Sequence, residues 1–403
     1  MKNRRIALIA CAIVILIISG VIYIAGRLAD SDADISAEEI TEKGSQTEND
    51  IQKQQESYTS DPQIQVDHID ITEEERERIE GLMDSVGDCS RDIYAAADKG
   101  NLQNIVLAEA TVHEMAGAVA AQGRAVTCGS YDFNMLNYEK TDECLRDAVN
   151  GKASETEFFQ ITTSGHIMYF GLESKQEDLV VTYANAAFNE NLELHIQQME
   201  KFKVYDWSYT EKGWLIWEKA LSQNHEMDMH SFFRILPLDE KCRQLGNEYI
   251  RPVSYFSNNL FLVDWDGSSL DKIEFNDLYE FLYKIKYGES VNTDDIQNGI
   301  GKEDFENVIR TFFDISAEEL EKLAGYDFDK GLYPWEPIMA WNHVKQFQPF
   351  PEVVKCVDNQ DGTYTLYVEA VFVEEGKDCS FHHTVTMRKE GGVCLAHIKE
   401  VEK

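Results

Sequence analysis

The sequence has few basic residues for its length. Lys and Arg together number 37 among 403 residues, against 73 Asp and Glu, so the formal net charge is −36. A surface this acidic repels phosphate backbones and anionic lipid headgroups. We therefore expect no nucleic-acid partner, and solubility is the simplest role for the excess of acidic side chains.

The sequence also lacks the short motifs that carry well-defined chemistry. It has no Gly-x-Ser-x-Gly nucleophile elbow, and His113-Glu114 is not followed by the second histidine of a zinc protease helix. His225 and His230 are five residues apart, which separates them by about 140° on a helix. Segments 264–267 and 359–362 match the middle of a calcium-binding loop but lack oxygen ligands at its first and last positions. We expect both segments to be turns, and we expect no catalytic motif and no cofactor.

Two Cys-x-x-His units near the C-terminus are the candidates for a metal site. They are Cys379–His382 and Cys394–His397, and zinc is held by four such ligands that converge on one point. Both units lie in predicted strands, where residues three apart point to opposite faces. A tight turn at Gly391-Gly392 would leave Cys379 more than about 20 Å from His397, at roughly 3.3 Å per residue. We therefore expect no metal.

One long run without charge lies near the N-terminus. Ile6–Ala25 contains no charged residue, and a helix of that length spans a hydrocarbon core of about 30 Å. Basic residues precede this run and acidic residues follow it closely. The positive-inside rule therefore predicts a single-pass anchor in the cell membrane, with a cytoplasmic N-terminus and the bulk of the chain outside. A cleaved signal peptide and a lipoprotein attached through Cys11 are the alternatives.

Cysteine usage is compatible with that compartment but does not define a fold. Seven cysteines follow Cys11, and an odd number cannot pair fully within one chain. An exterior location permits disulfides, so the sequence is compatible with one or two disulfide bridges. The sequence does not indicate a disulfide framework.

Composition and hydrophobic periodicity divide the chain into five segments. Residues 28–70 are acidic, polar and poor in large apolar groups, which predicts a disordered stalk. The full series is an anchor (1–27), the stalk (28–70), helices followed by an antiparallel sheet (71–221), a mainly helical part (222–345) and C-terminal β hairpins (346–403). We therefore predict an α+β protein.

The helices are predicted by apolar residues at spacings of three and four. One stripe runs from Ile79 to Ala96 behind a capping box, Thr72-x-x-Glu75, and a second runs from Ile105 to Val119. These two stripes predict a helical hairpin, and a third helix is expected near 138–149. Further helices are expected at 278–285, closed by Gly288, at 305–312, and after Ser316, which fits a helix cap.

The strands are predicted by alternation of apolar and polar residues between turn signals. An antiparallel meander is expected over 158–219, and a single strand over Leu260–Trp265. In the tail, strands at 352–357, 363–373, 380–388 and 393–400 are separated by Asp361-Gly362 and Gly391-Gly392, which are typical of hairpin turns.

One hairpin is rich in aromatic residues. Tyr205, Trp207 and Tyr209 alternate along one strand, and Trp214 and Trp217 follow the turn. Aromatic pairs across strands stabilise hairpins by about 0.2–1 kcal/mol each. Exposed rings in a row can also stack on a sugar or hold a peptide. Trp207, Trp214 and Trp217 are therefore the candidate ligand-binding residues, with packing within the protein as the alternative.

The same hairpin carries a resemblance to a known family. The stretches 205–215 (YDWSYTEKGWL), 235–240 (ILPLDE) and 308–316 (VIRTFFDIS) resemble an uncharacterised family of membrane-anchored proteins from clostridia-type Gram-positive bacteria. The resemblance extends over 75–403. It implies a domain of unknown function, without assigned catalytic residues.

These observations favour a membrane-anchored, extracytoplasmic binding protein with a surface protein or a glycan as its ligand. The alternative is a hydrolase that acts on wall polymer or peptide through carboxylates. A pocket with two carboxylates whose pKa values are pushed apart would favour the hydrolase.

Overall fold

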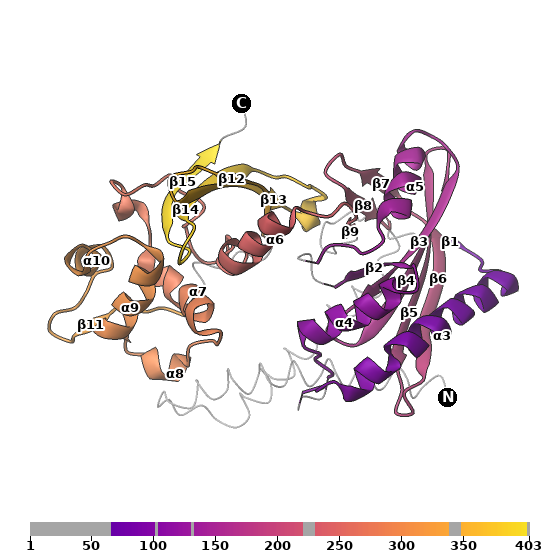
Figure 1. Ribbon diagram of the computed structural model, residues 1–403, viewed down its shortest axis with the longest axis horizontal. Coiled ribbons are helices and arrows are strands. Elements are labelled where there is room, and N and C mark those ends of the chain that lie inside the picture. The colour runs from indigo at the N-terminus through magenta and orange to yellow at the C-terminus, as the bar shows by residue number, and fades with distance from the viewer. Residues whose placement is uncertain (1–65, 101–103, 130–132, 221–229, 338–347, 401–403) are drawn as a thin grey trace, which may run out of the picture. The chain divides into compact units, whose positions relative to one another are not determined.

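The computed structural model describes residues 66–100, 104–129, 133–220, 230–337 and 348–400 (Figure 1). The predicted anchor, Ile6–Ala25, lies outside the described residues, and so does the stalk up to residue 65. Within the described ranges, every helix is too short or too polar to cross a bilayer.

A six-stranded sheet organises the first half of the described chain. Its order is β1-β6-β5-β4-β3-β2, and all neighbours are antiparallel except β2 and β3. The strands are β1 Asp67–Ile69, β2 Ala125–Cys128, β3 Ser154–Ile161, β4 His166–Lys175, β5 Asp178–Phe188 and β6 Leu194–Lys203. The predicted meander is thus confirmed for its antiparallel core, whereas the parallel pairing of β2 adds an element that the sequence did not predict.

Two helices cover one face of this sheet. They are α3 Glu73–Ala96 and α4 Glu109–Ala120, which lie side by side (Figure 1). The capping box at the start of α3 is present, because the Thr72 hydroxyl accepts from the Glu75 N–H at 3.2 Å and the Glu75 carboxylate accepts from the Thr72 N–H at 2.8 Å. The third predicted helix is α5 Glu139–Val149. All three helices are confirmed.

The opposite face of the sheet is covered by a smaller, three-stranded sheet. Its strands are β7 Asp206–Tyr209, β8 Trp214–Glu218 and β9 His230–Arg234. Side chains alternate along β3, so the two faces of the six-stranded sheet are buried in different cores. Phe159 belongs to the core beneath α3 and α4, and Phe158 belongs to the core beneath β8 and β9. The second half of the β7–β8 hairpin is therefore core on both sides.

The second half of the described chain combines helices and a four-stranded antiparallel sheet around one apolar core. The helices are α6 Glu240–Leu245, α7 Phe275–Tyr287, α8 Thr293–Ile296, α9 Lys302–Phe312 and α10 Ala317–Leu323. The sheet runs β12 Phe350–Asp358, β13 Thr363–Val371, β14 His382–Arg388 and β15 Cys394–Glu400, with a short pair β10 Ile300–Gly301 and β11 Leu332–Tyr333 elsewhere. The C-terminal hairpins are confirmed, and Gly288 ends α7 in the left-handed conformation at φ +75°.

A buried ion pair joins the two halves. Arg234 on β9 lies 3.5 Å from the Glu352 carboxylate on β12, and both side chains are more than nine-tenths buried. The Trp214 indole N–H donates to the same carboxylate at 3.3 Å. Burial raises the pKa of Glu352, although the positive charge of Arg234 opposes that shift. The carboxylate is therefore held at the junction by groups from the other half.

Several predictions from the sequence need correction. β1 lies inside the range predicted to be a disordered stalk, but its residues pair with Lys201–Lys203 of β6, so residues 67–69 belong to the folded chain. The strand predicted at Leu260–Trp265 is wrong: this segment turns, and its backbone pairs with the sheet through a single bridge between Trp265 and His397. The run is apolar because Leu260 and Trp265 are buried in the core, not because it is paired. β9 also lies in a part predicted to be helical.

Candidate functional site

The structure separates the three tryptophans proposed as ligand-binding residues. Trp214 and Trp217 are 0% and 2% exposed, whereas Trp207 is half-buried and its indole N–H donates to the Glu177 carbonyl at 2.9 Å. Trp214 and Trp217 are three residues apart on β8, so they point to opposite faces. Trp214 packs on Phe232, and Trp217 stacks on Phe233. The three rings therefore form no common exposed row, and a ligand role for them remains a prediction.

Trp217 nevertheless lines a cavity between the two sheets of the first half. The cavity has a volume of about 500 Å³, and we call it the aromatic cavity. Its lining comes from strands of both sheets and contains six aromatic rings. The lining residues are Gly129, Gln160, Thr162, Met168, Phe170, Tyr183, Glu200, Phe202, Trp217, Lys219, His230, Ser231, Phe232 and Phe233.

A larger cleft follows an irregular helix in the second half. The chain continues from α6 directly into a π-helical turn, Gly246–Ile250, in which the Arg251 N–H donates to the Gly246 carbonyl five residues earlier at 2.8 Å. π-helical turns are rare and are frequent at functional sites. Gly246 allows this helix to lie close to β12, since a Cβ there would come within 3.2 Å of Val353.

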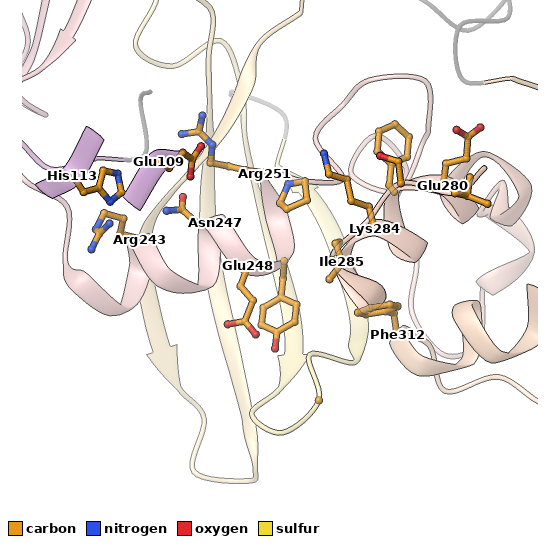
Figure 2. A pocket seen from close by; sticks show the side chains of 17 residues that line it. Glu109, His113, Arg243, Asn247, Glu248, Arg251, Glu280, Lys284, Ile285 and Phe312 are labelled. Atoms are coloured by element: carbon orange, nitrogen blue, oxygen red, sulfur yellow. The ribbon is translucent and has the colours of Figure 1, made fainter. Parts of the chain in front are cut away.

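Three polar side chains share one face of this helix. Positions 243, 247 and 251 are four residues apart, as neighbours on one helix face are, and the π-helical turn keeps 247 and 251 nearly in line. Figure 2 shows Arg243, Asn247 and Arg251 on the side of the helix that faces α4, which contributes Glu109 and His113. Tyr249 lies against Gly392 in the β14–β15 turn, where no other residue would fit, because a Cβ would be 2.1 Å from the ring.

The cleft has a volume of about 1030 Å³ and two ends of different character. The end beside α4 holds His113, Arg243 and Arg251, together with Glu109. The end beside α7 is more apolar and holds Lys284 with Glu280 and Glu248 among apolar side chains. These apolar residues are Tyr249, Phe281, Ile285, Val291 and Phe312.

The cleft is rich in basic residues compared with the rest of the chain. The chain has 73 acidic residues for 37 basic ones, whereas the cleft is lined by three Lys or Arg and three Glu, together with a histidine. Arg251 also lies over the ring of Phe350 at 5.2 Å, and Arg243 pairs with Glu240 at 2.6 Å. These contacts hold the guanidinium groups in place at the wall of the cleft.

Carboxylates gather in a third pocket, of about 480 Å³, on the six-stranded sheet. Lys201 donates to Glu75 at 2.7 Å and to Glu173 at 2.9 Å. The hydrogen bond from Lys201, supported by the Thr72 N–H, lowers the pKa of Glu75 to about 2. A general acid needs a shift in the opposite direction. The carboxylate whose pKa is raised, Glu352, is buried at the junction of the two halves and does not line this pocket.

The two Cys-x-x-His units of the tail are not brought together as a group of metal ligands. Val385 lies opposite His397 in the pairing of β14 with β15, and His397 donates from Nδ1 to the Val263 carbonyl at 2.7 Å. His383 bonds the buried Tyr255 hydroxyl at 2.8 Å. In the part of the chain that the structure describes, no three His, Cys, Asp or Glu side chains are grouped to hold a metal ion. Asp266 and Asp361 bind the backbone N–H groups of Ser268 and Thr363, as expected of turns.

Sequence reasoning missed both the cleft and the aromatic cavity. Arg243, Asn247 and Arg251 are spaced by four, a helical signal, but the pattern is polar and gives no reason to single it out. The lining of the aromatic cavity comes from six separate strands and the loops that flank them, and that convergence depends on tertiary structure.

Comparison with known proteins gives a family and no function. No curated protein and no solved structure matches the chain. Residues 74–400 match a family described as a family of unknown function (DUF6070), which includes both sheets of the first half, the cleft and the C-terminal hairpins. Because the match covers most of the sequence, the chain belongs to this family of unknown function.

Proposed function

We propose that this protein is a membrane-anchored, extracytoplasmic binding protein whose cleft along the π-helical turn holds a segment of a partner polypeptide. The observation that carries the proposal is the mixed lining of the cleft: basic groups at the end beside α4 and an apolar surface at the end beside α7. A ligand that matches both ends carries a negative charge and apolar side chains a short distance apart, as a peptide does.

The electrostatics of the whole chain support a selective role for the basic groups. A surface with net charge −36 repels an acidic ligand at long range, so such a ligand gains attraction only where basic groups are concentrated. Arg243 and Arg251 supply planar guanidinium groups, which bind carboxylates through two parallel hydrogen bonds. We infer that an acidic side chain or a C-terminal carboxylate of the peptide lies against them.

The anchor and the orientation belong to the same proposal. The uncharged run Ile6–Ala25 and the basic residues before it support a single membrane span with the described part outside the cell. Membership in a membrane-anchored family of clostridia-type bacteria, which the resemblance implies, agrees with that arrangement. The hydrolase alternative has less support, because the lowered pKa of Glu75 does not suit a general acid and the carboxylate with a raised pKa, Glu352, lies outside the pocket of carboxylates.

The proposal is tested with a peptide array and the full-length protein. The array presents 15-residue peptides in which Asp, Lys, Leu and Ser are permuted, each with a free or an amidated C-terminus. We expect the bound peptides to combine an acidic group with at least one Leu. Arg251→Gln should lower the affinity for the peptide that binds most tightly by about tenfold, because a partly desolvated charge pair contributes about 1–2 kcal/mol to binding.

The control is Arg146→Gln, which removes an arginine that pairs with Asp142 on α5, away from the cleft. It should leave binding unchanged. Equal binding by all peptides, or equal loss in both variants, would overturn the proposal. Cleavage of the bound peptides by the wild-type protein would support the hydrolase instead.

A further inference from the structure

The aromatic cavity shares no lining residue with the cleft, so it calls for a separate explanation. We propose that it is a carbohydrate-binding site that takes a short, uncharged saccharide. The argument rests on the rings, on the polar groups and on the charge balance of the lining, and it does not depend on the proposed peptide cleft.

The rings form a rigid wall. Phe170 lies 4.8 Å from Phe233 and 5.3 Å from Tyr183 between ring centroids, and Trp217 stacks on Phe233 at 5.0 Å. Phe170, Trp217 and Phe233 are almost fully buried, whereas Tyr183 is half-buried. Tyr183 is therefore the ring best placed to meet a ligand, and the others hold it from behind. Aromatic faces of this kind pack well against the C–H face of a sugar ring.

The cavity also contains groups that bind hydroxyls. Gln160, Thr162 and Ser231 line it with neutral donors and acceptors, and Glu200 lies directly opposite Tyr183 in the pairing of β5 with β6. Part of this capacity is used within the protein, since Gln160 donates to the Cys128 carbonyl at 3.3 Å and the Thr162 hydroxyl lies 2.8 Å from that of Ser164. A purely apolar ligand would take the remaining polar atoms away from water without replacing their hydrogen bonds, which costs free energy. A ligand with apolar faces and a polar edge avoids that cost, and a sugar ring has this character.

The charges in the lining compensate one another. Lys219 donates to Glu200 at 2.7 Å, and its ammonium group lies over the ring of Phe202 at 4.5 Å. Burial of the ring, with a smaller effect of the Glu200 charge, raises the pKa of Tyr183, so its hydroxyl, which is neutral at physiological pH, can donate a hydrogen bond. With its two charged side chains joined in a pair, the cavity favours a ligand without net charge. The volume of about 500 Å³ lies within the range of small-molecule sites, about 300–1,000 Å³.

The test is saturation-transfer NMR on the full-length protein with four defined probes. Three are saccharides: N-acetylglucosamine, its β-1,4-linked dimer and cellobiose. The fourth is indole, an apolar aromatic molecule. We expect at least one saccharide to bind, with the strongest saturation on the C–H protons of one ring face. Binding of indole alone, or of none of the four, would overturn the proposal.

Substitutions locate the binding. Tyr183→Ala should lower the affinity for the saccharide by at least fivefold, and Tyr183→Phe, which keeps the ring, should change that affinity by less than threefold. The control is Tyr367→Ala, a surface tyrosine on β13 that is 37% exposed and lies outside the cavity. Thermal melts establish that each variant is folded, and Ser231→Ala, which removes one small polar group, provides a second measurement if Tyr183→Ala is unfolded. Binding that survives both Tyr183→Ala and Ser231→Ala would place the saccharide elsewhere and overturn the proposal.

Discussion

Replacing each tryptophan of the β7–β8 hairpin by alanine separates packing from ligand contact. Trp214 is fully buried, and its ring contacts Phe232 at 5.4 Å and Phe350 at 6.0 Å between ring centroids. Its N–H also binds Glu352, and the guanidinium of Arg234 lies 5.6 Å from the ring centre. Trp214→Ala therefore removes a large core side chain and one hydrogen bond to a buried carboxylate.

The expected losses differ along the hairpin. A buried Trp→Ala change costs about 3–5 kcal/mol of unfolding free energy, and the lost hydrogen bond to Glu352 adds roughly 1–3 kcal/mol. Trp217→Ala should cost about 3–5 kcal/mol, since the ring is 2% exposed but lacks the carboxylate contact. Trp207→Ala should cost only about 1 kcal/mol, because the ring is half-buried and makes one hydrogen bond to a backbone carbonyl.

Thermal unfolding of the three full-length variants measures this order. A chain of this length loses roughly 2 °C of Tm per kcal/mol, so we expect drops of roughly 6–10 °C for Trp217→Ala, more for Trp214→Ala, and about 2 °C for Trp207→Ala. Melting of Trp214→Ala and Trp217→Ala within about one degree of the wild type would refute the packing described above. Loss of saccharide binding in Trp217→Ala would support the proposed saccharide site only if the variant remains folded.

Four further predictions concern the ends, the charges and the topology. In thermal melts, a chain that starts at Val66 should unfold at the same temperature as the full protein. A chain that starts at Asp70 lacks β1, and its unfolding free energy should be lower by about 1–3 kcal/mol. The Glu75 pKa is lowered to about 2, below its ordinary value of 4.5, so the contribution of Glu75 to the free energy of unfolding is present above pH 4.5 and is lost as the pH falls towards 2. Denaturant titrations should therefore show that Glu75→Gln loses about 1–2 kcal/mol less unfolding free energy than the wild type over this pH range, a figure reduced for solvent screening. Glu352→Gln leaves Arg234 buried without its counter-charge and should cost about 3–5 kcal/mol in the same titrations. Protease added to intact protoplasts should degrade the chain beyond residue 28, and protection of the C-terminus would contradict the proposed orientation.

Local signals in the sequence predicted most elements of the fold. The capping box before α3, the glycine after α7 and the hairpin turns that contain Asp361-Gly362 and Gly391-Gly392 act through neighbouring residues only, and all of them are found. The misses involve contacts between distant parts of the chain. β1 has three residues and is fixed by β6 more than a hundred positions later, and β2 joins the sheet in parallel after an intervening helix.

The candidate site was less predictable than the fold. The aromatic hairpin was singled out because its composition is unusual, but alternation places Trp214 and Trp217 in different cores, and Trp217 lines the aromatic cavity. The π-helical turn at Gly246–Ile250 is an irregularity that no residue pattern predicts, and three of its residues line the cleft. Burial and the approach of distant elements, which produce both sites, are not properties of any short stretch of sequence.

The ion pair between Arg234 and Glu352 has a consequence for how this family can evolve. The arginine and the carboxylate belong to different halves of the chain and are buried where the halves meet, so separation would expose both charges to water together with the apolar cluster of Trp214, Ile216, Phe232 and Val371. A half that is inherited, duplicated or exchanged on its own would therefore carry an exposed apolar surface around a single charge. We expect the two halves to remain together in one gene and to change in step at this junction, although each has an apolar core of its own.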